Sequence, residues 1–590
     1  MKKTILSFLI IAVIASCNTK PSNQVKEANK DLATMLDKYY EERLQLFPLE
    51  ATSNGDNRYN DKLYADFTNS HRQTLKFFYS KYSTEIEKFK RDDLNDNDKI
   101  SYDVFKREMA MSLKGISFKD NLTPLNQFWG LHLTLGQLGS GDGNQPFKTV
   151  ADYDNWLKRA TVFSSWADSA IVYFNKGIAE NYVLPKSLVV KIIPQCKSIV
   201  VADITTSLFW GPIKKLPSTF SNADKQRLTE EYTKLIKEQI IPSYKKLGDF
   251  LEKEYLPKAR ATSGISANPT GNDYYKYLIE QWTTTNKTPE EIYAKGLEEV
   301  KRIREVMEQV KTEVKYSGDL KSFFDFMKND KQFMPYKAPQ EVLIAYHAIQ
   351  TKIDPKLQTM FGHVPKSKFE IRQTEAFRAA SASAEYNQPS ADGSRPGIFY
   401  VPILDATKYN TTSGMESLFL HEAIPGHHYQ ISLQQENESL PKFRRFSWYG
   451  AYGEGWALYS ESLGKELGCY TDPYQYMGAL GDEMHRAIRL VVDVAIHTKN
   501  MTREEAIKYM MDNEAISEEG ATAEIERYMA IPAQALSYKT GALKIKELRE
   551  KYKKEKGDKF SLTAFHDEFL KDGCLPLDVL EKKMEAWSKL

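Results

Sequence analysis

Three of the ten histidines of this 590-residue chain fall within eight positions, as His421, His427 and His428. Glu422 directly follows the first histidine, and Pro425-Gly426 separates it from the other two. Proline removes a helical hydrogen bond and glycine relaxes the chain, so a continuous helix cannot run through this segment undistorted. The fold must therefore build a histidine-rich site around an interrupted helix.

Upstream residues predict that His421 and Glu422 lie on a helix. Ser413 and Glu416 have the spacing of a capping box. Apolar residues at helical spacing follow them, namely Met415, Leu418 and Phe419. We expect the interruption to come at the end of this helix, as a bulge at the proline and glycine.

A catalytic zinc site needs neutral imidazoles, a carboxylate ligand, an open position for water and a second carboxylate that accepts the proton of this water. His421 supplies one imidazole and Glu422 the base. In the common H-E-x-x-H motif the second histidine lies four residues after the first. Here the histidines follow after six and seven residues, so the motif is a variant.

The identity of the second ligand depends on the backbone at the interruption. On an undistorted helix the seventh residue returns to within about 20° of the start and the sixth lies about 120° away, which favours His428. A two-residue insertion that bulges at Pro425-Gly426 would instead bring His427 into the ligand position. We prefer His427 and keep His428 as the alternative.

Glu454 is the predicted third ligand. It lies 27 residues after His427, far enough for a second helix to return to the first. Its neighbours Gly453 and Gly455 would allow close approach of a metal and a substrate. The alternative is a first-turn glutamate that complements a helix dipole.

The N-terminus has the pattern of an exported lipoprotein. Two lysines precede an apolar run and a small-residue exit, which predicts a signal peptide over residues 1–17. Cys17 ends a lipobox-like sequence and is the predicted lipidation site, whereas an ordinary signal peptide with an incidental cysteine is the alternative. Residues 18–30 are polar and read as a tether. We expect a periplasmic or outer-membrane lipoprotein.

Charge and cysteine content exclude other classes. Without Lys2 and Lys3 the formal charge falls from +2 to zero, and no long basic block remains, so nucleic acid is not an expected partner. Three further cysteines, Cys196, Cys469 and Cys574, allow at most one disulfide. The fold must be held by its core, and nothing in the sequence indicates an oligomeric state.

Helix signals dominate the chain. Thr288 to Glu291 and Thr502 to Glu505 each combine a cap residue with a capping-box glutamate. Residues 397–404 read as a strand, and the flanking prolines suggest an edge strand that could pair with an extended peptide. We expect a mainly α, two-lobed zincin-like body with a small sheet beside the active-site helix, divided into residues 31–270 and a catalytic lobe over 271–590.

From about residue 30 to the C-terminus the sequence resembles the bacterial family catalogued as domain of unknown function 885, placed among the gluzincin-type zinc peptidases. The resemblance rests on His421 to Gln430, Glu454 to Glu461, Pro124 to Gln127, Arg395 to Gly397, Gly468 to Pro473, Arg486 to His497 and Arg527 to Lys539. It implies a zinc site in which Glu454 is a ligand, as in zinc aminopeptidases. Dipeptidyl peptidase III offers a parallel for a lengthened histidine motif.

Other candidate residues surround this motif. Arg527-Tyr528 is similar to the Arg-Tyr pair of angiotensin-converting enzyme, which implies that Tyr528 stabilises the oxyanion, with Tyr538 in reserve. Asp493 and His497 share a helix face and are candidates for an orienting carboxylate and a catalytic donor, or for a buried structural pair. Glu461, two turns after Glu454, could orient His421 or His427, or lie in solvent.

Substrate binding requires a partner for a buried peptide carboxylate. The candidates are Lys539, Arg395 and Arg527. The leading hypothesis is thus a zinc peptidase acting on oligopeptides, with Glu422 as general base and Tyr528 as oxyanion donor. The alternatives are a zinc hydrolase of another amide and a non-catalytic ligand-binding lipoprotein; a serine hydrolase is disfavoured because no G-x-S-x-G elbow is present.

Overall fold

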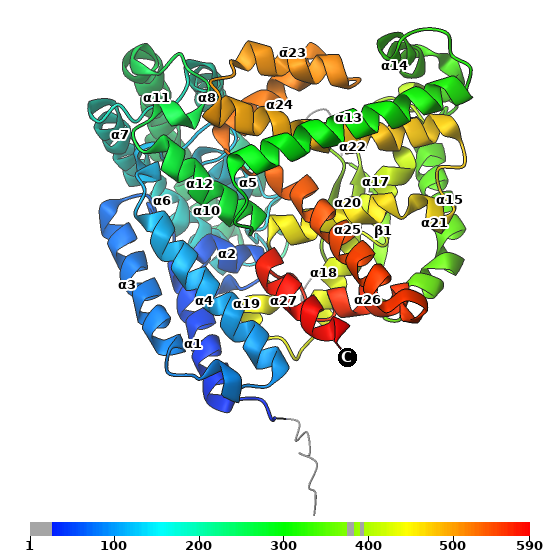
Figure 1. Cartoon of the computed structure of the whole chain (residues 1–590). Coiled ribbons are helices and arrows are strands. Elements are labelled where there is room, and N and C mark those ends of the chain that lie inside the picture. Colours follow the sequence, from blue (N-terminus) through cyan, green and yellow to red (C-terminus); the bar gives the residue numbers. More distant parts are fainter. Residues whose placement is uncertain (1–25, 375–382, 390–394, 413, 590) are drawn as a thin grey trace, which may run out of the picture.

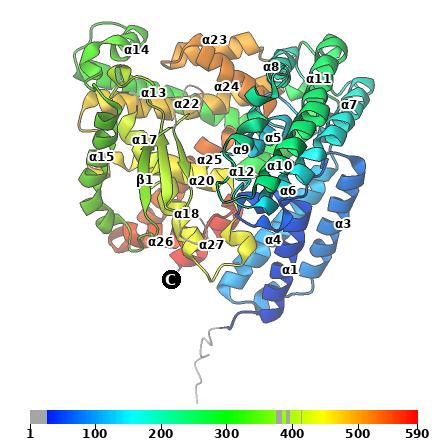
Figure 2. The ribbon, with the colours of Figure 1, turned by 180° about the vertical axis from the view of Figure 1, so that it is seen from behind.

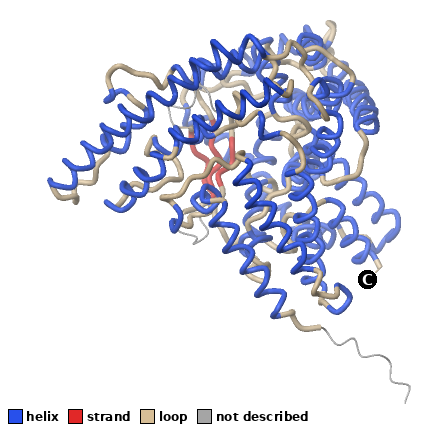
Figure 3. The backbone as a smooth tube through the Cα atoms, turned by 90° about the vertical axis from the view of Figure 1, so that its left-hand side faces the viewer, coloured by secondary structure: helices blue, strands red, loops and turns tan. Residues whose placement is uncertain are grey.

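The computed structural model describes residues 26–374, 383–389, 395–412 and 414–589. Helices make up most of this part of the chain, and three short strands form its single sheet (Figures 1 and 3). The predicted mainly helical fold with a small sheet is confirmed. None of the helices in the described ranges combines the length and apolarity needed to cross a bilayer.

The first eleven helices precede residue 270. They are α1 (Lys30–Leu46), α2 (Pro48–Ser53), α3 (Asn69–Ile86), α4 (Asp96–Ile116), α5 (Leu131–Gly139), α6 (Val150–Thr161), α7 (Phe163–Ala179), α8 (Lys186–Lys197), α9 (Gly211–Lys214), α10 (Asn222–Leu235) and α11 (Ile241–Phe250).

The second half carries α12 (Gly271–Thr283), α13 (Pro289–Glu313), α14 (Leu320–Asn329), α15 (Pro339–Met360), α17 (Met415–Glu422), α18 (His427–Glu436), α19 (Lys442–Arg445), α20 (Gly450–Ser462), α21 (Gly464–Leu467), α22 (Pro473–Thr498), α23 (Arg503–Asn513), α24 (Glu518–Ala530), α25 (Leu536–Lys556), α26 (Leu562–Leu570) and α27 (Leu577–Ser588). Both predicted capping boxes form: Thr288 with Glu291 starts α13 and Thr502 with Glu505 starts α23.

The sheet has the order β1-β3-β2, with β1 at Phe369–Gln373, β2 at Glu385–Asn387 and β3 at Gly397–Val401. β3 pairs in parallel with β1 and antiparallel with β2. The predicted strand is present, but its assignment as an edge strand was wrong. Pro396 and Pro402 lie just outside its ends, so neither interrupts the ladder, and β3 has no open edge for a peptide.

The sheet packs against α17. The Phe419 ring lies 6.3 Å from Phe369 of β1 and 6.4 Å from Phe399 of β3, measured between centroids. The sheet thus lies beside the helix that carries His421, as the sequence predicts.

The largest core mixes the two ends of the chain. It joins buried residues of α1, α3 and α4 to those of α15, β3, α17, α20 and α25 to α27, and Figure 2 shows the N-terminal helices standing alongside the C-terminal ones. A second core belongs to residues 63–259 alone. The division near residue 270 therefore stays a prediction, because one core crosses it.

Two helix pairs pack closely in the second half of the chain. α13 runs beside α22 across the top of Figure 1. α20 and α25 touch through their backbones, since a Cβ on Gly455 would lie 2.6 Å from Cα of Gly541. Gly453 instead accommodates the Trp448 ring. Both glycines thus make close packing contacts within the protein.

The predicted interruption is a full break between α17 and α18. Ala423 has φ −97° and ψ −105°, and Gly426 has φ −75° and ψ −129°, so both leave the helical region. The indole N–H of Trp456 donates to the Pro425 carbonyl at 2.8 Å. Glu416 binds Lys352 and the Tyr470 N–H, while Ser413 lies outside the described residues.

Gly426→Ala should disrupt this break. A Cβ at this position would lie 1.9 Å from the carbonyl oxygen of His421, and the fully buried surroundings leave the backbone no room to yield. We expect a loss of about 3 kcal/mol or more in the free energy of unfolding, measured by denaturant titration.

Gly481→Ala is the matched control. Gly481 lies within α22, and a Cβ there would meet nothing within 4 Å. It should raise stability by about 0.5 to 1 kcal/mol, because alanine is the better helix former. Equal effects of the two substitutions would contradict the steric argument.

Acid should destabilise this fold through its buried imidazoles. Burial lowers the pKa of His132 to about 4, and those of His497 and His566 to about 3. The unfolded chain therefore binds more protons than the native chain between these values and about 6.5. Stability is complete above about pH 6.5 and should fall as the pH drops through this window, by up to roughly 1.4 kcal/mol per pH unit for each imidazole.

His566→Phe tests this linkage. The ring stacks on Phe361 with centroids 4.6 Å apart, so phenylalanine should fit. The variant loses the hydrogen bonds to Met360 and Tyr459 and should be less stable at pH 7.5. Its unfolding free energy should nevertheless depend less steeply on pH than that of the wild type; an unchanged slope would contradict the assignment.

Candidate metal centre

Three side chains from three helices converge on one point. His421 comes from the last turn of α17, His427 from the first residue of α18, and Glu454 from the first turns of α20. One ligand atom of each lies within 4.8 Å of the others. The break at Ala423–Gly426 makes this possible, because it turns His427 toward the end of α17.

The distances fit metal ligands better than hydrogen bonds. Nε2 of His421 and Nε2 of His427 each lie 3.5 Å from Oε2 of Glu454. This is beyond the usual 2.7 to 3.2 Å of an N–H···O bond. Ligands about 2.1 Å from a tetrahedral zinc ion would be separated by about 3.4 Å. Two imidazoles and one carboxylate are also a donor set that zinc accepts.

A second carboxylate holds the opposite side of His421. Oε1 of Glu461 lies 2.7 Å from Nδ1 of that ring, which leaves Nε2 facing Glu454. A carboxylate behind a metal-binding histidine fixes its orientation and raises its basicity. Glu461 is buried, so the alternative of a solvated glutamate does not apply.

Charges in the cluster are strongly coupled. Burial alone would lower the pKa of His421, but Glu454 and Glu461 raise it well above its usual value. Burial alone would raise the pKa of Glu454, but His427 and His421 hold it well below its usual range. The metal-free cluster is therefore an ion pair, and a metal ion would replace its protons.

Glu422 lies at the end of α17 next to His421 and forms no hydrogen bond or ion pair with the described part of the chain. Burial raises the pKa of its carboxyl group above the usual value, against the charges of His421 and His427. A carboxylate with a raised pKa and no fixed partner is suited to exchange a proton with a water molecule.

Arg486 is a neighbour that sequence reasoning did not assign to the site. Its positive charge acts on Glu422, and its buried Nε atom has no hydrogen-bond partner. Among the described residues, its one hydrogen bond and its ion pair both go to Asp482, at 3.3 and 3.5 Å. The signal available in the sequence was its position at the start of the Arg486 to His497 segment, three residues before Arg489 on α22.

His428 faces away from the cluster. Its Nδ1 lies 2.8 Å from the hydroxyl of Tyr386 and 3.3 Å from that of Ser432. The ring packs 4.8 Å from Phe369 of β1. Of the two adjacent histidines, His427 is the one beside Glu454.

Tyr528 belongs to a separate buried network. Its hydroxyl donates to Glu524 and accepts from Nε of Arg489 at 3.0 Å. No described contact joins it to His421, His427 or Glu454. Tyr538 is half-buried, and the Arg489 guanidinium lies 4.7 Å from its ring centroid.

Asp493 and His497 do not contact each other as the spacing suggested. Nδ1 of His497 accepts from the Ile265 N–H at 3.0 Å and Nε2 lies 3.1 Å from the Tyr528 carbonyl. Asp493 accepts from the Tyr275 hydroxyl at 2.6 Å and from the Ala533 N–H. Since both ring nitrogens of His497 are used by the backbone, we assign it a structural role in place of the predicted catalytic one.

The candidate cations for a substrate carboxylate lie in different surroundings. Lys539 is 2% exposed and pairs with Glu483 at 2.7 Å and Glu299 at 3.0 Å, so these acids already neutralise it. Arg527 donates to Gln534 at 2.9 Å. Arg395 donates to the carbonyl of Gln388 at 2.7 Å.

The remaining cysteines are free and buried, namely Cys196, Cys469 and Cys574. Cys17 and the whole signal-like segment lie outside the described residues.

Comparisons with other proteins identify relatives over nearly the whole chain. The crystal structure of a "putative lipoprotein" from Colwellia psychrerythraea is similar with a TM-score of 0.86 and 29% sequence identity, covering 95% of this chain and 99% of that one. A "putative lipoprotein of unknown function" from Shewanella oneidensis has a TM-score of 0.75 and 20% identity, covering 94% and 99%. The second likeness shows the shared fold alone.

No curated protein matches the sequence. The model of a family described as "Bacterial protein of unknown function (DUF885)" matches residues 48–584. This match includes the three converging side chains and every helix from α2 to α26. The chain therefore belongs to the DUF885 family.

Proposed function

We propose that this protein is a zinc-dependent peptidase that hydrolyses amide bonds of oligopeptides. The observation that carries the proposal is the pair of 3.5 Å separations from Glu454 to His421 and His427, which suit ligands of one zinc ion. A glutamate as the third ligand would make the centre of the gluzincin type. The two-lobed, zincin-like architecture expected from the sequence is part of this proposal.

Each residue of the centre would have a separate role in the reaction. His421, His427 and Glu454 hold the zinc ion, and Glu461 orients His421 through Nδ1. Zinc supplies Lewis acidity and lowers the pKa of water. Glu422 would accept a proton from the attacking water and pass it to the leaving amine. Its buried carboxylate suits this role, because it has no fixed partner among the described residues.

Stabilisation of the oxyanion needs a donor near Glu422. We favour Arg486 as this donor, because its buried Nε atom has no hydrogen-bond partner among the described residues and its charge acts on Glu422. Tyr538 is next, since its ring packs against Arg489, which lies one turn after Arg486 on α22. Tyr528 would first have to break its hydrogen bonds with Glu524 and Arg489 before it could donate to the oxyanion.

We also propose export and a lipid anchor at Cys17. The leader-like sequence supports this, and both similar solved proteins are described as putative lipoproteins. Periplasmic and outer-membrane positions fit equally. The alternative of a non-catalytic binding lipoprotein is less favoured, because ligand capture alone has no use for a partnerless buried glutamate beside two converging imidazoles.

Metal content tests the centre. The purified protein without its leader should carry about one zinc ion per chain by elemental analysis after mild chelator washing. His427→Ala should lose it, because one of three ligands is removed. His428→Ala is the matched control and should keep it, since His428 contacts Tyr386 and Ser432 instead. Retention in both variants, or no zinc in the wild type, would overturn the proposal.

Glu422→Gln tests the catalytic role separately from metal binding. The amide is nearly isosteric and cannot accept the proton, so cleavage of a peptide library, followed by mass spectrometry, should fall by about 10² to 10⁴-fold. Zinc content and thermal stability should stay at wild-type values. Full cleavage by this variant would exclude Glu422 as the base. A zinc-loaded wild type that cleaves no peptide would favour another amide as substrate.

A further inference from the structure

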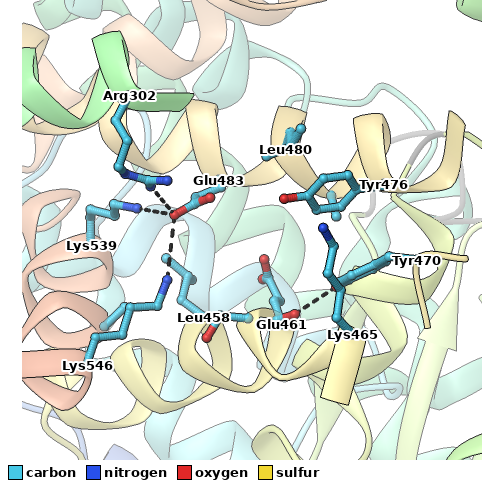
Figure 4. Close-up of a pocket in the computed structure, with 13 residues that line it drawn as sticks. Arg302, Leu458, Glu461, Lys465, Tyr470, Tyr476, Leu480, Glu483, Lys539 and Lys546 are labelled. Atoms are coloured by element: carbon cyan, nitrogen blue, oxygen red, sulfur yellow. Dashed lines mark hydrogen bonds and ion pairs between the residues drawn. The ribbon is translucent and has the colours of Figure 1, made fainter. Parts of the chain in front are cut away.

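A cavity adjoins the candidate metal centre through Glu461, which is one of the residues that line it (Figure 4). It has a volume of about 220 Å³ and opens between α13, α20, α21, α22 and α25. One water molecule occupies about 30 Å³ in the liquid, so the space suits a small solute with some water. Nothing in the proposed peptidase mechanism uses it.

One wall of the cavity gathers cations around a single carboxylate oxygen. Arg302, Lys539 and Lys546 lie 2.6, 2.7 and 3.7 Å from Oε1 of Glu483. Glu299 adds one more carboxylate and contacts Arg302 and Lys539 at 2.8 and 3.0 Å. On this wall three positive charges thus lie against two negative ones. Lys546 makes the longest ion pair of the three cations.

The opposite wall carries another cation. The Lys465 ammonium lies 3.8 Å from the centroid of the Tyr476 ring, and it makes no ion pair within the described ranges. Figure 4 shows Lys465 and Tyr476 across the cavity from Lys546 and Arg302. Counting Glu461, which also lines the cavity, and Glu299, four cations lie against three carboxylates. A partly enclosed space with this excess of positive charge attracts an anion.

We propose that this cavity is a binding site for a small anion, an inorganic oxyanion or a carboxylate, held between the Lys546 and Lys465 walls. A purely structural ion network would explain the pairs of Lys539 and Arg302. It would not explain the open volume, nor Lys465, which has no ion pair within the described residues, nor Lys546, whose one carboxylate is 3.7 Å away and shared with two other cations.

Glu461 connects this cavity to the metal centre. It lines the cavity and its Oε1 holds Nδ1 of His421, while Nε2 of the same ring faces Glu454. The anion therefore lies on the far side of the imidazole and is not positioned to bind the metal. Negative charge there would make His421 a better donor to a cation, so anion and metal should strengthen each other's binding. This coupling rests on the proposed function; the anion site itself does not.

Anion binding is tested on the metal-free protein without its leader. Inorganic phosphate and acetate are titrated in separate series, and binding is measured by calorimetry and by the shift of the melting temperature. We expect saturable binding that Lys546→Met weakens at least tenfold. Stronger binding of phosphate would identify an inorganic oxyanion as the ligand class, and stronger binding of acetate a carboxylate.

Lys551→Met is the matched control. Lys546 and Lys551 both lie on α25 and both side chains are 38% exposed, but Lys551 pairs with Glu585 outside the cavity. The Lys551→Met variant shows how much anion binding changes when one lysine outside the cavity is lost and when the salt concentration rises. Lys465→Met is the independent variant from the opposite wall and should also weaken binding. The proposal is overturned if neither anion binds saturably, or if Lys546→Met and Lys465→Met bind as tightly as Lys551→Met.

The coupling has its own readout. The rate at which a chelator removes zinc should fall in the presence of the bound anion, and this effect should vanish in Lys546→Met but persist in Lys551→Met. A protein that binds anion but no zinc would contradict only the proposed peptidase function. A protein that binds zinc but no anion would contradict only the cavity assignment.

Discussion

The break between α17 and α18 is the constraint on which the site depends. Two backbone positions, Ala423 and Gly426, leave the helical region and redirect the chain within a few residues. The Trp456 indole holds the Pro425 carbonyl from α20, so the helix that carries Glu454 also fixes the turn that carries His427. Because the break is buried and closely packed, the three side chains meet in one arrangement.

Burial of charge is the second organising feature. Glu422, His421 and Glu461 are all buried. A buried charge must be balanced by a neighbour, or the pKa of its group shifts, as it does for His421 and Glu422. A metal ion suits this environment, because it satisfies two imidazoles and a carboxylate at once. The same logic extends outward through Glu461 to the cationic cavity, where positive charges exceed negative ones.

Several polar residues near the site are used by the fold instead. His497 bridges the backbone at Ile265 and Tyr528, and Asp493 caps the turn at Ala533. Lys539 is neutralised by two glutamates that come from different helices. Each buried polar atom requires a hydrogen-bond partner. In a protein of this size, many residues that look catalytic in the sequence therefore serve buried hydrogen-bond networks.

The sequence by itself determined the helical class, the capped starts of α13 and α23, the placement of His421 and Glu422 on a helix, and a distortion of the chain at Pro425-Gly426, because these depend on local backbone preferences. It left His427 and His428 open, since their directions depend on the torsions of the break, which the surrounding helices fix. Only the tertiary structure decided that β3 is the central strand, that His428 turns to Tyr386, and that Arg486 lies near Glu422. These contacts join residues far apart in the chain, and long-range packing, not local preference, selects among them.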